Sequence, residues 1–203
     1  MKFTYYGHAC FAVEAVGKRL LFDPFITPNL LAARIDLEPI TANFNLVSHG
    51  HGDHVADVAE LARQTGAKLI APYEVGSWFE NQGVENVQAM NHGGAATTSF
   101  GRVKLTAAIH SNSMPDGSYG GTPAGFVVET KDGNFYYSGD TALTSDMKLI
   151  ADETELRFPV LPIGDFFTMG IKDAVRARIS SARTRSRAST TIPFLRSSST
   201  ARG

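Results

Sequence analysis

The sequence predicts an α/β fold in which sheets and helices form layers within one domain. Short apolar segments bounded by turn residues are typical of strands, and segments with helical apolar spacing lie between them. Such a mixture is typical of layered α/β architectures. The 203 residues fit a single hydrophobic core, and a hydrophobic fraction of 43% with 19% charged residues is typical of a globular protein.

The expected strands occur as hairpins near the N-terminus and then recur along the chain. They are predicted at residues 2–6, 10–16, 19–22, 44–47, 68–71, 103–109, 125–130 and 134–138, with the turn KDGN at 131–134. One amphipathic helix is predicted at 54–66, because apolar residues recur at helical spacing and Gly66 follows the last turn. Further helices are predicted at 73–81, directly after Pro72, and at 144–152.

Cysteine content and the N-terminus limit the compartment and the kind of metal site. Cys10 is the only cysteine, so neither an intramolecular disulfide nor a cysteine-based zinc cluster can form. The N-terminal MKFTYYGHACF turns polar within a few residues, and no run of about 18 apolar residues occurs. We therefore expect a cytoplasmic protein without a membrane span, in which any metal is held by histidines and carboxylates.

Charge divides the chain into two predicted regions. Residues 1–175 contain all 20 acidic residues and 12 Lys and Arg, a net charge of −8, and form the predicted folded domain. Residues 176–203 contain seven Arg, no Lys and no acidic residue, and too few large apolar residues to fill a core. This Arg/Ser/Thr-rich tail is compatible with a disordered basic segment, with an arm that touches RNA or a membrane, or with translation out of frame.

The stretch SHGHGDH at residues 48–54 concentrates three of the six histidines. In an extended segment, His49 and His51 point the same way and can reach one metal ion. Asp53 and His54 then lie on the turn into the next helix and face a second position. Imidazole and carboxylate ligands suit Zn²⁺, Mn²⁺ or Fe²⁺. A polar turn that is enriched in histidine by chance is the alternative.

The spacing His-x-His-x-Asp-His resembles the signature of the metallo-β-lactamase superfamily. That resemblance implies an αβ/βα four-layer sandwich with a dinuclear metal site between two sheets. Three further segments occur in the order that the superfamily shows: LFDPF with Asp23, AAIHSNS with His110 and YYSGDT with Asp140. The sequence over about residues 1–175 looks most like metal-dependent hydrolases without a settled substrate, related to the ascorbate-6-phosphate lactonases.

The resemblance also implies a ligand set for two zinc ions, with Mn²⁺ or Fe²⁺ as alternatives. His49, His51 and His110 would hold the first ion, Asp53 and His54 the second, and Asp140 would bridge both. Asp23 would orient a ligand from behind. Taken singly, His110 is also compatible with a surface loop, Asp140 with an Asx-turn or helix cap, and Asp23 with a turn.

Two histidines outside this set have less definite roles. His8, in GHACF, could line the mouth of the pocket, bind substrate or support a ligand, but a purely structural role fits equally well. His92, in MNHGG, is expected to lie in a loop away from the site.

The C-terminal part departs from the superfamily pattern, which ends with one more histidine after a late strand. No histidine follows His110 in this sequence. When the last base of each tail codon is combined with the first two bases of the next, residues 179–183 can encode Phe-Ile-Gly-Ala. Residues 187–195 can encode Gly-Val-His-Tyr-Asp-Thr-Phe-Pro, with the histidine across the codons of Ser189 and Thr190. We therefore favour a frameshift over a native basic tail, and we expect weak binding of the second metal, low solubility and an unpaired sheet edge.

These features predict a metal-dependent hydrolase that acts on a small ester, lactone or phosphate-containing metabolite. Attack would come from hydroxide bound to the metal ions, and Asp53 would serve as the catalytic residue that orients it. A nuclease or phosphodiesterase of the same superfamily is the first alternative, although the acidic balance of residues 1–175 disfavours a nucleic acid. Further alternatives are an impaired metal-binding variant that lacks the last ligand and a module whose Arg-rich tail binds nucleic acid. The chain could also form homo-oligomers.

Overall fold

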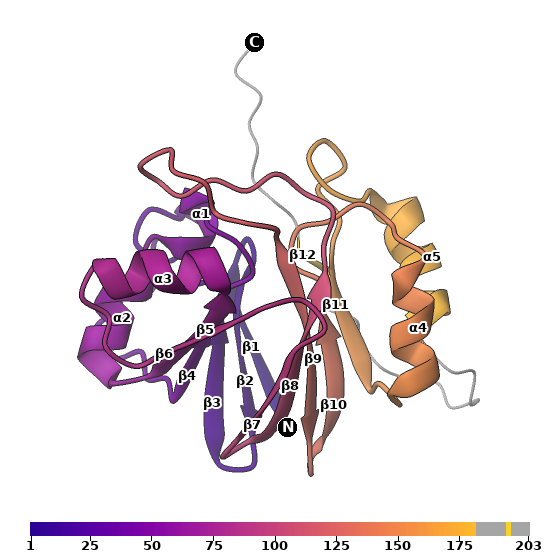
Figure 1. Ribbon diagram of the computed structural model, residues 1–203, viewed down its shortest axis with the longest axis horizontal. Helices are drawn as coiled ribbons and strands as arrows, with labels where there is room; N and C mark the ends of the chain where they lie inside the picture. Colours follow the sequence, from indigo (N-terminus) through magenta and orange to yellow (C-terminus); the bar gives the residue numbers. More distant parts are fainter. Residues whose placement is uncertain (182–193, 196–203) are drawn as a thin grey trace.

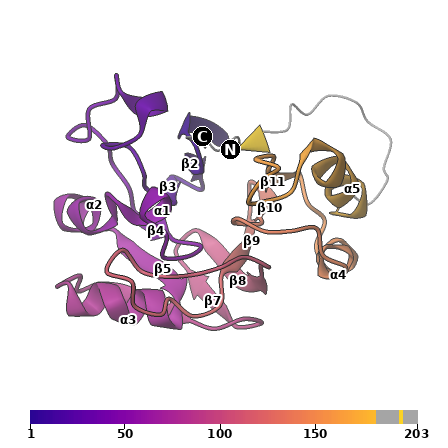
Figure 2. The same cartoon turned by 90° about the horizontal axis from the view of Figure 1, so that it is seen from above.

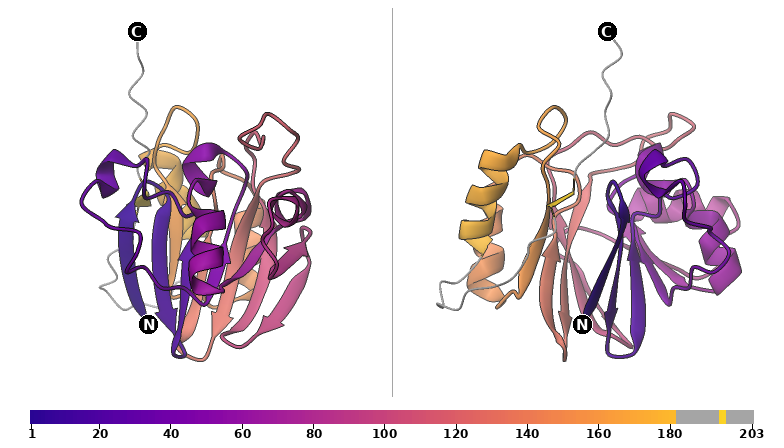
Figure 3. Two further views of the ribbon diagram at one scale, coloured as in Figure 1. Left: turned by 90° about the vertical axis from the view of Figure 1, so that its left-hand side faces the viewer. Right: turned by 180° about the vertical axis from the view of Figure 1, so that it is seen from behind.

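Two six-stranded sheets face each other in the computed structural model, and helices cover their outer faces (Figure 1). The structure describes residues 1–181 and 194–195. Seen from above, α2 and α3 lie outside one sheet and α4 and α5 outside the other (Figure 2). The side views show the same four layers (Figure 3). The αβ/βα sandwich predicted from the sequence is therefore confirmed.

The first sheet has the strand order β1-β2-β3-β4-β5-β6. β1 to β3 are antiparallel, and β3 to β6 run parallel to one another. Its strands are β1 (Lys2–Gly7), β2 (Cys10–Ala15), β3 (Lys18–Phe22), β4 (Phe44–Leu46), β5 (Lys68–Pro72) and β6 (Val87–Met90). The helical elements of this half are η1 (Leu30–Ala32), α1 (Gly52–Val55), α2 (Val58–Thr65) and α3 (Tyr73–Asn81).

The second sheet has the order β12-β11-β10-β9-β8-β7. Its strands are β7 (Ala95–Thr98), β8 (Gly101–Ala107), β9 (Ala124–Thr130), β10 (Gly133–Tyr137), β11 (Phe158–Pro162) and β12 (Phe194–Leu195). α4 (Asp146–Glu153) and α5 (Ile171–Ser181) cover this sheet. Of the helices in the described part of the chain, none combines the length and the apolar character needed to cross a bilayer.

The main core lies between the sheets and is rich in aromatic rings. Phe11 and Phe22 stack with ring centroids 4.5 Å apart, and Tyr137 packs edge-on against both. Phe126 and Phe135 add edge-on contacts to Phe22. All five side chains are fully buried, so this cluster joins the two sheets by burial of large apolar surfaces.

All eight strands predicted from the sequence are present, with shifts of one or two residues at their ends. The helix predicted at 54–66 is instead two helices, α1 and α2. The chain breaks at Asp57, whose carboxylate accepts hydrogen bonds from the backbone N–H groups of Ile26 (2.5 Å) and Thr27 (3.0 Å). These hydrogen bonds hold Asp57 against the loop after β3. A continuous helix would move the carboxylate away from these two N–H groups.

The C-terminal expectations are tested only in part. α5 continues past residue 176 to Ser181, and Ala177 is fully buried against the second sheet's outer core. β12 pairs in parallel with Leu161 and Pro162 of β11, so the expectation of an unpaired edge is wrong at these two positions. The remainder of the predicted tail, 182–193 and 196–203, lies outside the described residues, as do the codons of Ser189 and Thr190.

Candidate metal centre

The predicted site residues meet at one end of the two sheets. The SHGHGDH stretch follows β4 and leads into α1, while His110 follows β8 and Asp140 follows β10. Figure 1 shows α1 and the loop after β8 at the same end of the sandwich. The Ser48 carbonyl accepts the N–H of Ala124 in β9 at 2.9 Å, which joins this stretch to the second sheet.

Three imidazoles form the first group of candidate ligands. One ring nitrogen from each of His49, His51 and His110 lies within 4.8 Å of the others. His49 Nε2 and His51 Nδ1 are 3.0 Å apart. Burial and the neighbouring His54 lower the pKa of His49 well below its usual value, and burial and His110 lower the pKa of His51. Both rings are therefore neutral near pH 7, the form in which imidazole binds a metal.

A second group of candidate ligands contains His8, Asp53 and His54, whose ligand atoms also lie within 4.8 Å of one another. His8 Nε2 is 3.1 Å from Asp53 Oδ2, and 49% of the Asp53 side chain is exposed, so solvent reaches this carboxylate. Burial opposes ionisation of Asp53, but the neighbouring His8 and His54 imidazoles outweigh burial and lower its pKa. An ionised carboxylate beside two imidazoles is an appropriate ligand set for a divalent cation.

Asp140 lies between the two groups. Its Oδ2 is 3.5 Å from His54 Nε2 and 3.9 Å from His110 Nε2. Burial alone would lower the pKa of His54, but the carboxylates of Asp140 and Asp23 outweigh burial and raise it well above its usual value. Against the raising effect of burial, His54 lowers the pKa of Asp140. The carboxylate is thus ionised and lies near one histidine of each group.

Asp23 supports the site from behind and is fully buried. Its Oδ1 accepts the Ser48 N–H and its Oδ2 accepts the Ser48 hydroxyl, both at 2.7 Å. Asp23 Oδ2 also lies 2.9 Å from His54 Nδ1 and accepts the Tyr137 hydroxyl. When His54 Nδ1 carries a proton for Asp23, Nε2 is left to face Asp140 and Asp53. Asp23 therefore contacts both the backbone of the histidine stretch and the His54 ring.

Gly50 allows the loop after His110 to approach the histidine stretch. The Gly50 N–H donates to Asn112 Oδ1 at 2.7 Å. A Cβ at Gly50 would contact the Met114 sulfur and lie 3.0 Å from the Ser113 carbonyl oxygen. Asn112 also donates to the Gly120 carbonyl oxygen at 2.6 Å. Glycine is therefore required between the two histidines by the packing of the His110 loop.

Sequence reasoning missed Ser48 and Tyr137, which hold Asp23, and Asn112, which anchors the His110 loop. Ser48 and Asn112 each lie within two residues of a predicted ligand, and that proximity was the only signal in the sequence. Tyr137 lies in an apolar strand pattern that predicts only a core residue. His92 lies outside the clustered histidines and places Nε2 2.8 Å from the Pro123 carbonyl oxygen, as expected of a loop histidine.

The side chains fit divalent cations. Among the described residues, buried nitrogens without a hydrogen-bond partner include His8 Nδ1, His8 Nε2 and His54 Nε2. Buried polar atoms in proteins almost always have a partner, so imidazole nitrogens without a hydrogen bond beside two carboxylates fit a site for a positively charged ligand. The donor set contains nitrogen and oxygen atoms but no thiolate, which is compatible with zinc, manganese or iron.

Comparison with known proteins agrees with this geometry. Residues 18–185 match the family model of the beta-lactamase superfamily domain. A UPF0173 metal-dependent hydrolase of Flavobacterium johnsoniae is 50% identical over 177 residues, which are 87% of this chain and 78% of that protein. A UPF0173 metal-dependent hydrolase of Methylacidiphilum infernorum is 47% identical over 177 residues, again 87% of this chain and 78% of that protein.

Among solved structures, the metallo hydrolase Igni18 of Ignicoccus hospitalis is similar at 31% identity and a TM-score of 0.74. That match covers 86% of this chain and 76% of Igni18. Fold, site geometry and sequence similarity thus agree, and the chain belongs to the beta-lactamase superfamily, among its metal-dependent hydrolases.

Proposed function

We propose that this chain hydrolyses a small ester, lactone or phosphate-containing metabolite with the help of two divalent cations. Zinc is the expected metal. The observation that carries the proposal is the convergence of two ligand groups, one around His49 and one around Asp53, with Asp140 between them. The names of the related proteins, metal-dependent hydrolases, support the reaction class. Their printed names identify no substrate.

Each side chain contributes a definite part of the chemistry. When bound, the cations would activate a water molecule and polarise the carbonyl or phosphoryl oxygen under attack. His49, His51 and His110 would hold one cation, and Asp53 and His54 the other, with Asp140 between them. Asp53 is ionised and half-exposed, so its free oxygen can orient the attacking water and hold its proton. Asp23 would keep His54 in the tautomer that leaves Nε2 free.

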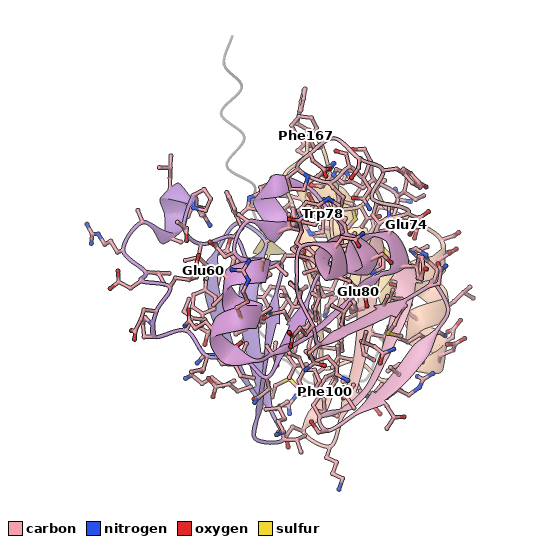
Figure 4. The ribbon with its side chains drawn as sticks, turned by 60° about the vertical axis from the view of Figure 1, so that its left-hand side comes forward. Glu60, Glu74, Trp78, Glu80, Phe100 and Phe167 are labelled. Carbon is pink, nitrogen blue, oxygen red and sulfur yellow. The ribbon has the colours of Figure 1, made fainter. Side chains whose placement is uncertain are left out.

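The rim of the site favours substrates with an apolar group. Ile109, directly before His110, is 62% exposed, and Phe166 and Phe167 are 80% and 63% exposed. Figure 4 shows Phe167 projecting outward from the protein. The loop of Phe167 is anchored beside Asp140, because the Met169 N–H donates to the Thr141 carbonyl oxygen at 3.0 Å. Exposed apolar side chains on these loops favour an ester or lactone with a hydrophobic substituent over a polyanion.

A panel of chromogenic substrates tests this proposal. We expect zinc-loaded protein to hydrolyse p-nitrophenyl butyrate and a medium-chain lactone faster than bis-p-nitrophenyl phosphate or RNA. Asp53→Asn should lower kcat by about 100-fold or more, since general acid–base groups contribute about 10² to 10⁴. The exposed Asp116→Asn is the matched control and should leave the rate unchanged. Faster cleavage of RNA than of the esters would favour the nuclease alternative.

The tail decides how much of this activity the present chain retains. We propose that the sequence from about residue 176 is out of frame. The ground for this proposal is the missing late histidine and the Arg-rich composition of residues 176–203. Under this proposal the chain is an impaired form of a hydrolase related to the ascorbate-6-phosphate lactonases. Resequencing the gene around codons 174–180 tests it: an extra or missing base is expected, and an intact frame would overturn the proposal.

We also propose a cellular location, an oligomeric state and a class of substrate. A cytoplasmic location is part of the proposal, and a homo-oligomer is compatible with the exposed phenylalanines. A small-molecule substrate fits the acidic balance of residues 1–175, which disfavours nucleic acid. Fractionation of cells and sedimentation analysis of the purified protein test the first two points.

A further inference from the structure

His8 is held in an unusual backbone conformation at the turn between β1 and β2. Its φ is +55°, in the left-handed region that side chains other than glycine rarely adopt. Gly7, directly before it, has φ +111°, and a Cβ there would lie 2.8 Å from the Leu31 Cβ. The Tyr5 hydroxyl donates to the His8 carbonyl oxygen at 2.8 Å and fixes the turn. A positive φ is usual at the first residue of a two-residue hairpin loop, so the turn and the Tyr5 hydrogen bond together fix the position of His8.

The His8 side chain points into the site and is buried. Only 5% of the residue is exposed, and its ring packs edge-on against Phe25 and His54 at centroid distances of 5.5 and 5.4 Å. Neither ring nitrogen of His8 has a hydrogen-bond partner. A buried imidazole with both nitrogens unsatisfied is costly unless a further group contacts it.

The separation of His8 from Asp53 is that of two ligands of one ion. His8 Nε2 lies 3.1 Å from Asp53 Oδ2, in an ion-pair contact. Two ligands with metal bonds of about 2.0–2.1 Å lie about 3.3 Å apart around a tetrahedral ion. His54 Nε2 also lacks a hydrogen bond, and one ring nitrogen of His54 lies within 4.8 Å of a ligand atom of each of these residues.

We propose that His8 is a direct ligand of the second cation, together with Asp53 and His54. This inference rests on the proposed two-cation function and adds a ligand from the N-terminal hairpin to the superfamily's set. The second cation then receives two imidazoles and a carboxylate from described residues, with Asp140 beside them. A role as a positioning residue, in which His8 only donates a hydrogen bond to Asp53, is the competing explanation.

Cobalt-loaded full-length chain separates these roles. Each histidine bound to paramagnetic Co²⁺ gives a strongly shifted exchangeable N–H signal in the proton spectrum. His8→Asn should lose one such signal and weaken binding of the second cobalt by at least about tenfold, while the first site is unchanged. Asparagine adopts the left-handed conformation with little strain, so the turn should persist. His92→Asn is the matched control and should keep all shifted signals and both affinities.

A second variant gives a positive signal. His8→Cys places a thiolate toward the second site, and direct ligation should add a sulfur-to-cobalt charge-transfer band in the near ultraviolet. If wild type binds two cobalt ions, but His8→Asn keeps every shifted signal and His8→Cys shows no such band, the inference is wrong and the proposed function stands. If wild type binds one cobalt ion or none, the proposed two-cation function fails and the inference fails with it.

Discussion

Tyr137 in β10 donates its hydroxyl to Asp23, which directly follows β3, and so links the two sheets directly beneath the histidine cluster. The two residues are 114 positions apart in the sequence. Burial, followed by the nearby Asp23 carboxylate, raises the pKa of Tyr137 well above its usual value, so the phenol remains a donor. Asp23 in turn holds Ser48 and His54. The candidate metal centre is thus fixed to both sheets through one carboxylate.

Tyr137→Phe should lower the free energy of unfolding by about 1.5–3 kcal/mol, because it removes a hydrogen bond to a buried charged group. Urea denaturation of metal-free protein measures the loss. Tyr119→Phe, at a side chain that is 73% exposed, is the control and should change stability little. Equal stability of Tyr137→Phe and wild type would mean that the contact contributes nothing to folding.

Asp23→Asn should weaken zinc binding by about 10- to 100-fold, because the amide cannot hold the Ser48 N–H and His54 Nδ1–H as a carboxylate does. Competition with a fluorescent chelator measures the affinity. Asp57→Asn is a matched buried control. It should destabilise the loop after β3, where Asp57 caps Ile26 and Thr27, while zinc affinity stays the same. Similar affinity losses in both variants would contradict a specific role for Asp23.

Alanine substitutions at the two glycines of the histidine stretch should have very different effects on stability and zinc binding. Gly50→Ala inserts a methyl group against Met114 and Ser113, and overpacking of this kind costs about 1–3 kcal/mol. Displacement of the His110 loop should also weaken zinc binding. Gly52→Ala meets no atom within 4 Å and should keep both properties. Thermal unfolding and zinc titration of both variants provide the comparison. Wild-type stability and zinc affinity in Gly50→Ala would show that the His110 loop can move away from the added methyl group.

Alkaline pH should destabilise the metal-free protein. Burial raises the pKa of the Cys10 thiol above its usual value of 9.0. The folded state therefore keeps a proton that the unfolded state loses, so this contribution is complete below about pH 9 and declines as pH rises toward the folded-state pKa. Urea unfolding at several pH values should show this decline, and Cys10→Ala should show a smaller one. Identical slopes in the two proteins would rule out a contribution from the thiol.

Local patterns in the sequence were sufficient for most central strands but not for the edges. β6 and β7 close the outer ends of the two sheets, and their side chains are mostly half-buried or exposed, so they lack the apolar alternation that identifies a strand. β11 contains Pro159 and Pro162, which argue against a sheet strand on local grounds. Only the pairings with β10, which includes Pro159, and with β12, which includes Pro162, show that these prolines are accommodated.

For the site, the sequence identified the side chains but not what holds them together. His49, His51 and His54 lie in one short stretch, whereas the positions of His110 and Asp140 followed from resemblance to a family. The structure brings all five into neighbouring groups. The unsatisfied nitrogens of His8 and the link from Tyr137 to Asp23 depend on the packing of the sheets, which no local pattern encodes.

Zinc content after gel filtration tests the central claim, that distant imidazoles and carboxylates form one metal centre. Wild-type protein loaded with zinc should retain at least one tightly bound equivalent per chain, and His110→Ala should lose it while remaining folded by circular dichroism. His92→Ala should retain as much zinc as wild type. Zinc content that is zero in wild type, or unchanged in His110→Ala, would contradict the assignment of His49, His51 and His110 to one cation.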